Sequence, residues 1–161
     1  MKLQNAIHHA NKAHLGRLDK QGFNYFVHPT CVAFAVAHRG ENSQVAAFLH
    51  DVKEDHLLYW TAAELSRKLN PRQKHLLSFL THNEDETYGE YIERMLVDED
   101  ACYIKLGDIG HNTSSKRKLP GSTLADKRYY PYASLIISAL EEWHGQSTAD
   151  IERVLYAFDH D

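Results

Sequence analysis

The sequence predicts an all-α protein, a single helical bundle of about seven to nine helices. Two patterns support this: apolar residues recur at the spacing of helices, and the alternation typical of strands is nearly absent. The third observation is length, because 161 residues lie within the usual range for one domain with one core. We therefore expect residues 1–161 to form a single domain.

The first predicted helices flank a loop. An opening helix extends to about His14, and the turn-forming residues 16–24 predict a loop. Proline is favourable at a first helical position, so Pro29 is expected to start a helix that continues through Ala37. The residue before a proline avoids the helical conformation, which predicts an extended backbone at His28. Residues 39–42 then interrupt the helix.

The middle of the chain carries several helix start signals. Ser43 is expected to cap a helix that runs into the sequence HDVKED. Three further starts are marked by a capping box or a proline, at Thr61–Glu64, Asn70–Pro71 and Thr87–Glu90.

The last third of the chain has one ambiguous segment. The apolar spacing of DACYIKLGD fits a helix or a short strand, and we interpret it as a helix. A basic loop at 113–122 is then followed by a long helix from about Asp126 to Trp143, and by another after Ser147 or Thr148.

The formal net charge of −4 argues against a broad surface that binds nucleic-acid phosphates, so a small ligand is expected instead. The opening MKLQNAIHHANKAH lacks the apolar stretch of a secretory signal, and no run of about 18 apolar residues suggests a membrane span. We therefore expect a cytoplasmic protein without a membrane partner. Cys31 and Cys102 lie in apolar surroundings and are predicted to be buried free thiols.

Histidine is abundant, with twelve residues, and the sharpest cluster is His50-Asp51 followed by Glu54 and Asp55. Residues four apart share a helix face, so His50 would lie over Glu54 and Asp51 over Asp55. Two ligands and two acid–base groups could converge at this helix end. The alternative is a solvated helix end with a chance histidine.

His28 and Asp108, the latter within KLGDIGHN, are weak signals when taken separately. With His50 and Asp51 they make a mixed nitrogen and oxygen set that suits Mn²⁺, Fe²⁺, Zn²⁺ or Mg²⁺. Such an ion would lower the pKa of a bound water and neutralise charge on a phosphoryl oxygen. Glu54 or Asp55 could then orient or deprotonate that water.

Other polar residues have weaker patterns. A surface or core role is favoured for the histidines that do not belong to a comparable cluster of ionisable residues, namely His14, His38, His56, His75, His82 and His144. The basic residues 116–118 could bind phosphate, but a solvated loop is favoured. Arg128 and Tyr132 lie four apart on a helix, where they could present a guanidinium and a phenol to an anionic nucleotide or simply pack on the surface.

Four segments together resemble the HD-domain alarmone hydrolases, which include the hydrolase half of RelA/SpoT-type enzymes and free-standing small alarmone hydrolases. These segments are AHLGRLDKQGFNYFVHP, AAFLHDVKED, YIKLGDIGHN and, less closely, KRYYPYA. Their order and spacing cover the chain from about residue 6 to residue 140, which is far more specific than one HD dipeptide.

The resemblance implies an all-α metal-dependent phosphohydrolase that converts ppGpp to GDP and pyrophosphate. It implies one Mn²⁺ held by four ligands, His28, His50, Asp51 and Asp108. Glu54 and Asp55 match the pair that activates the attacking water. Four further residues match positions near the metal or the nucleotide: Arg17, Asn112, Arg128 and Tyr132.

The chain departs from the family pattern at several positions. Leu18 stands where a second basic residue is common, Gly107 replaces an alanine, and Ile109-Gly110 replaces a basic–hydrophobic pair. Two alternatives to this function remain open. One is an HD phosphohydrolase acting on another nucleotide, such as a nucleoside monophosphate or a 2′- or 3′-phosphorylated cofactor. The other is a non-catalytic metal-bound nucleotide sensor or protein-binding module.

Overall fold

A computed structural model describes residues 1–52, 62–117, 119 and 121–159. In these residues the chain forms nine α-helices and one 3₁₀ turn, and the sole strand-like contact is an isolated bridge between Leu18 and Asn24. The all-α prediction is therefore confirmed. The elements are α1 (Leu3–Ala13), α2 (Val27–Ala35), η1 (Ala37–Arg39), α3 (Glu41–Leu49), α5 (Ala62–Lys68), α6 (Pro71–Leu80), α7 (Tyr88–Met95), α8 (Glu99–Thr113), α9 (Leu124–Glu142) and α10 (Thr148–Leu155).

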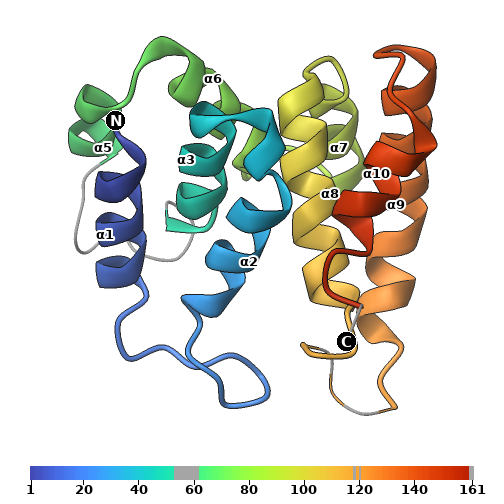
Figure 1. The fold of residues 1–161 in the computed structure, drawn as a ribbon, viewed down its shortest axis with the longest axis horizontal. Coiled ribbons are helices and arrows are strands. Elements are labelled where there is room, and N and C mark those ends of the chain that lie inside the picture. The colour runs from blue at the N-terminus through green and yellow to red at the C-terminus, as the bar shows by residue number, and fades with distance from the viewer. Residues whose placement is uncertain (53–61, 118, 120, 160–161) are drawn as a thin grey trace.

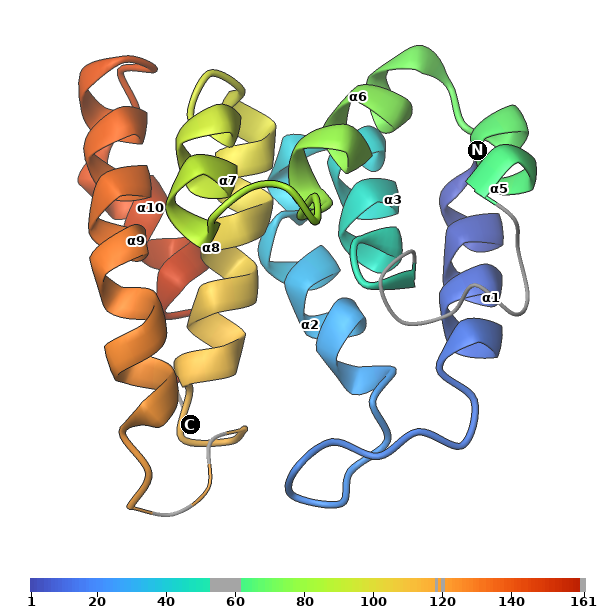
Figure 2. The same ribbon diagram turned by 180° about the vertical axis from the view of Figure 1, so that it is seen from behind.

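The helices are arranged around α8, which lies between α2 on one side and α9 and α10 on the other (Figure 1). Helix α3 packs against both α1 and α2, and α6 crosses one end of the bundle (Figures 1 and 2). Nearly every residue of α8 is buried, including Ile104, Leu106 and Ile109 at 0% exposure. Helix α8 is thus the core element, and any charged side chain on it needs a partner inside the protein.

Three helix start signals are confirmed. Asn70 and Thr87 each form a complete capping box, with Gln73 and Glu90 respectively, because each pair exchanges side-chain and backbone hydrogen bonds. Ser147 caps α10 through the amide of Asp150. The segment DACYIKLGD is helical, within α8. The predicted capping box at Thr61–Glu64 includes a residue outside the described part of the chain.

Two predictions near the first helices are wrong. Helix α2 begins at Val27, so His28 is helical rather than extended. Pro29 removes no helical hydrogen bond here, because the first bond of α2 between residues four apart comes from the next residue, Thr30, to the carbonyl of Phe26. The helix also ends at Ala35, before the 3₁₀ turn, and Gly40 with φ of 88° separates that turn from α3.

The prediction that Ser43 caps α3 is wrong. Gly40 occupies the cap position without a side-chain bond, and Ser43 is buried inside the helix. The Ser43 hydroxyl donates to the carbonyl of Arg39 and therefore does not accept from an amide at the helix end.

Both cysteines are free thiols, with Cys102 buried and Cys31 half-buried. Among the described helices, none combines the length and the apolar character that crossing a membrane would require.

Candidate metal centre

Three side chains from two neighbouring segments form a compact cluster. His28 is in the first turn of α2, and His50 and Asp51 directly follow α3. One ligand atom from each of the three lies within 4.8 Å of the other two. The His50 Nε2 atom is 3.1 Å from Asp51 Oδ1, and the His28 Nε2 atom is 3.5 Å from Asp51 Oδ2. This spacing is short enough for one divalent ion to contact all three groups.

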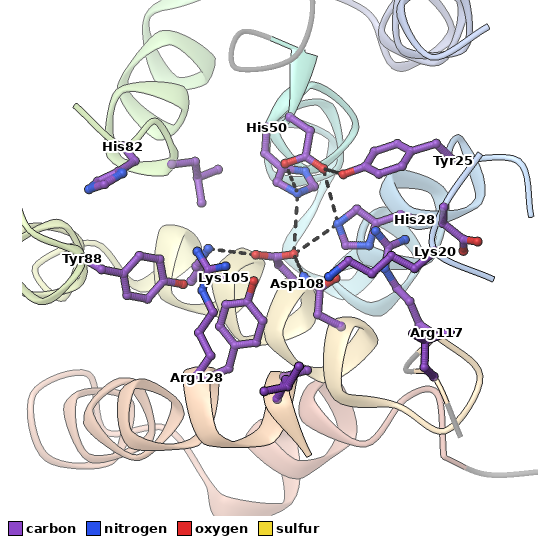
Figure 3. Close-up of a pocket in the computed structure, with 18 of the residues that line it drawn as sticks. Lys20, Tyr25, His28, His50, His82, Tyr88, Lys105, Asp108, Arg117 and Arg128 are labelled. Atoms are coloured by element: carbon purple, nitrogen blue, oxygen red, sulfur yellow. Dashed lines mark hydrogen bonds and ion pairs between the residues drawn. The ribbon is translucent and has the colours of Figure 1, made fainter. Parts of the chain in front are cut away.

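Asp108 on the buried helix α8 adds a fourth group from a distant part of the chain (Figure 3). Its Oδ1 atom lies 3.1 Å from His28 Nε2 and 3.8 Å from His50 Nε2. Asn112, one turn further along α8, donates to the same oxygen at 2.6 Å, and Lys105 donates to Oδ2 at 2.8 Å. Both carboxylate oxygens of Asp108 are therefore oriented by residues of its own helix.

The imidazole of His50 is oriented as a metal ligand would be. Its Nδ1 atom lies 2.7 Å from the Ala47 carbonyl, so Nδ1 carries a proton that it donates to that oxygen. Its Nε2 atom is buried and has no hydrogen bond within the described residues. A buried nitrogen that faces two carboxylates without a hydrogen bond fits a divalent cation well, and the nitrogen and oxygen donor set suits Mn²⁺ and similar ions.

Tyr25 supports the outer side of the cluster. Its hydroxyl donates to Asp51 Oδ2 at 2.8 Å, and its ring lies 4.9 Å from that of the buried His14. The guanidinium groups of Arg17 and Arg117 lie 4.7 and 5.1 Å from the centre of the Tyr25 ring. Two cations are thus held beside the cluster by one aromatic ring.

Burial and the neighbouring charges shift the pKa values of the residues in the cluster. Burial alone would lower the pKa of His50, but the charge of Asp51 and the contact with Asp108 outweigh it and raise that pKa to about 9. Burial would raise the pKa of Asp108, but the Lys105 ammonium and the two imidazoles hold it well below its usual range. For His28, burial prevails over both carboxylates, and the pKa is lowered. The carboxylates are therefore ionised at neutral pH, as metal binding requires, whereas a metal ion on His50 would have to displace the proton that these carboxylates favour on its Nε2 atom.

The cluster opens into a cavity of about 650 Å³ that a single nucleotide-sized ligand could occupy. Its walls come from the loop after α1, from α2, the end of α6 and the segment after it, from α7, α8 and α9, and from the loop before α9 (Figure 3). Basic and aromatic groups surround the carboxylates. The basic groups are Arg17, Lys20, Lys105, Arg117 and Arg128, and the tyrosines are Tyr25, Tyr88, Tyr91 and Tyr129.

The structure brings together the four residues predicted as metal ligands. The predicted substrate-binding residues Arg17, Asn112 and Arg128 all line the same cavity. Tyr132 is not among its lining residues, because its ring packs edge-on against Tyr88 at 4.7 Å, and Tyr129 lines the wall instead. Glu54 and Asp55 lie outside the described residues.

Several residues of this site were not singled out from the sequence. Lys105 had a usable signal, since a lysine on an otherwise apolar helix, three residues before an aspartate, must be paired when buried. Tyr25 had none, because its role depends on a contact between separate segments. Arg117 and His82, for which solvated or structural roles were favoured, both line the cavity.

The fold and the site together define an all-helical protein with a histidine–carboxylate cluster at the floor of a basic cavity. No protein-family model matches the chain. The chain is similar to a protein named probable GTP pyrophosphokinase from Mycobacterium leprae (strain TN), with 32% identity over 136 residues. The match covers 78% of this chain and 17% of that relative, so the chain spans only a small part of the relative's length.

Proposed function

We propose that this chain is a single HD-type domain that hydrolyses (p)ppGpp, releasing pyrophosphate and GDP or GTP. One observation carries the proposal: His28, His50, Asp51 and Asp108, from three separate segments, converge at the floor of a cavity with basic walls. This arrangement suits the hydrolysis of a phosphorylated nucleotide, because the carboxylates can bind a metal ion and the cations can bind phosphate groups.

The four clustered residues would hold Mn²⁺ or another divalent ion. When bound, such an ion lowers the pKa of a water and neutralises charge on a phosphoryl oxygen. Lys105 and Asn112 keep the Asp108 carboxylate in place through their bonds to its two oxygens. Glu54 and Asp55, which follow His50-Asp51 in the sequence, would orient the attacking water and accept its proton.

The cavity walls would bind the nucleotide. Arg17 and Arg128 lie on different segments of the wall and would each contact phosphate oxygens. Tyr129 lines the wall beside Arg128 and would provide the ring and the hydroxyl expected of Tyr132. Tyr132 itself would act indirectly, by supporting the Tyr88 ring.

The substrate class is supported by the name of the relative, which points to guanosine nucleotides and pyrophosphoryl groups. That name describes transfer to GTP, and it belongs to a much longer protein. Hydrolysis is the better match for this chain, because its clustered ligands are of the kind that activates water. Synthesis of the same alarmone is the second candidate, since the relative's name favours it.

Product analysis with purified protein tests the proposal. The chelator-treated protein is incubated with ppGpp, with and without Mn²⁺, and in parallel with GDP, GTP and ATP. We expect Mn²⁺-dependent release of GDP and pyrophosphate that Asp51→Asn abolishes and the exposed-site control Glu152→Gln retains. Formation of ppGpp from the mixed nucleotides, without hydrolysis, would establish the synthetic direction instead.

A further inference from the structure

We infer that His111 is a positioning residue that holds His28 in the one tautomer able to bind a metal ion. The inference rests on the proposed metal site. His111 lies on α8, and 83 positions separate it from His28 in the sequence. Their Nδ1 atoms are 2.8 Å apart, and the two ring centres are 5.0 Å apart. Both side chains are buried, His28 at 1% and His111 at 6% exposure.

The short distance between the two nitrogens restricts where the protons lie. One Nδ1 must donate and the other must accept, because two N–H groups cannot approach to 2.8 Å. The Nε2 atom of His28 faces Asp51 and Asp108, and a metal ligand must present a bare nitrogen there. The proton of a ligating His28 is therefore on Nδ1, and His111 accepts it.

The second histidine of the cluster offers an internal comparison. Nδ1 of His50 donates to the backbone carbonyl of Ala47, the usual way in which a ligating histidine is oriented. His28 has the imidazole of His111 at the corresponding position. The proton on Nδ1 of His28 is thus accepted by a side chain, whereas that of His50 is accepted by the backbone. A mutation can therefore remove the acceptor of His28.

His111 makes further contacts of its own. Its ring packs edge-on against Phe158 at 4.9 Å, and its backbone carbonyl accepts a bond from Ser114. Phe158 reaches this position because Gly110 lets the end of α10 approach α8 closely; a Cβ at Gly110 would lie 2.2 Å from the Leu155 carbonyl oxygen. The C-terminal turn of the chain thereby supports the metal site through His111.

Metal binding tests this inference without requiring catalysis. Free Mn²⁺ is measured by electron paramagnetic resonance during titration of wild type, His111→Leu and His111→Asn. Leucine removes the acceptor, and we expect Mn²⁺ affinity to fall by roughly 10- to 100-fold, as for other partners of metal-binding histidines. Asparagine can place a carbonyl oxygen near the position of Nδ1, so we expect it to restore most of the affinity. His8→Leu, at an exposed histidine of α1, is the matched control.

The outcomes separate the inference from the proposed function. Equal Mn²⁺ affinity in wild type and His111→Leu, or equal losses in the leucine and asparagine variants, would overturn the role of His111 alone. No Mn²⁺ binding by wild type would overturn the metal site and this inference together. Because the leucine variant risks misfolding, long-range ¹H–¹⁵N spectra of the wild-type protein with Zn²⁺ provide a second test. A His28 proton on Nδ1 is expected, and a proton on Nε2 would refute the inference.

Discussion

The Lys105 ammonium lies 2.8 Å from Asp108 Oδ2, and both residues are buried on the same face of α8. Tyr88 and Tyr91 surround the ammonium, with ring centres 5.4 and 5.2 Å from Nζ. Burial would lower the pKa of Lys105, but the Asp108 charge and these phenols hold it well above its usual value. A charged lysine and a charged aspartate thus coexist inside the protein because each compensates the other.

Removing this lysine should destabilise the protein. Lys105→Met leaves the Asp108 carboxylate buried without its cation, and breaking one side of a buried pair costs about 3–5 kcal/mol. We expect the lower end of that range, because Asn112, His28 and His50 still face the carboxylate. Urea unfolding of chelator-treated protein measures the loss. The exposed Lys74→Met on α6 serves as control, and equal stabilities of the two variants would contradict the pairing.

Two glycines of α8 should respond oppositely to alanine. A Cβ at Gly107 would meet Val154, Ala35 and Val32 at 3.5–3.6 Å, which is ordinary contact, so Gly107→Ala should stabilise by up to about 1 kcal/mol through helix propensity. A Cβ at Gly110 would meet the Leu155 carbonyl oxygen at 2.2 Å, so Gly110→Ala should destabilise by about 1–3 kcal/mol. Thermal unfolding of the two variants gives the comparison. Stabilisation by Gly110→Ala would show that the α8–α10 approach is not as described, and destabilisation by Gly107→Ala would contradict the space at that site.

Stability should also fall in acid through Glu86. Its carboxylate accepts from Arg94 at 2.7 and 3.0 Å and from the Asn83 amide at 2.8 Å, and the Arg94 contact lowers its pKa from 4.5 to about 2. A carboxyl group whose pKa is depressed on folding stabilises the protein above its unfolded pKa and loses that effect as pH falls. The window for Glu86 is therefore from about pH 4.5 down to about pH 2.

The corresponding variant is Glu86→Gln, which cannot ionise. It should be less stable than wild type at pH 6, and the difference should shrink as pH falls through that window. Denaturant unfolding at several pH values measures it. Glu93→Gln, at an exposed site of α7, the helix that carries Arg94, is the control. A constant difference for Glu86→Gln at all pH values would rule out this ion pair as the source.

Arg128 should affect nucleotide binding more than catalytic chemistry. Its guanidinium lines the cavity and lies 5.6 and 5.2 Å from the ring centres of Tyr88 and Tyr129. A hydrogen bond to a charged group contributes about 1.5–3 kcal/mol, so Arg128→Gln should lower kcat/KM for ppGpp by roughly ten- to a hundredfold, mainly through KM. Arg153→Gln on the exposed face of α10 is the control. A loss confined to kcat would assign Arg128 to the chemical step instead.

Local signals in the sequence were sufficient for much of the fold. Asn70 and Thr87 bond to amides within their own first turn, so their capping boxes can be identified without knowing the rest of the structure. The start of α2 could not be identified in this way. Proline at Pro29 is compatible with several positions in a first helical turn, and the turn formed by Asn24 and Tyr25 decides among them.

The sequence by itself determined the helical class, because apolar spacing is a local pattern, and it singled out the four residues of the candidate metal cluster through the motifs that carry them. Only the tertiary structure decided their partners. The bonds of His28 to His111 and of Tyr25 to Asp51 join segments far apart in the chain, and the choice of Tyr129 over Tyr132 depends on the rotation of α9 against α7. Such contacts follow from how the helices pack, and helix packing is set by the whole buried surface rather than by any local pattern.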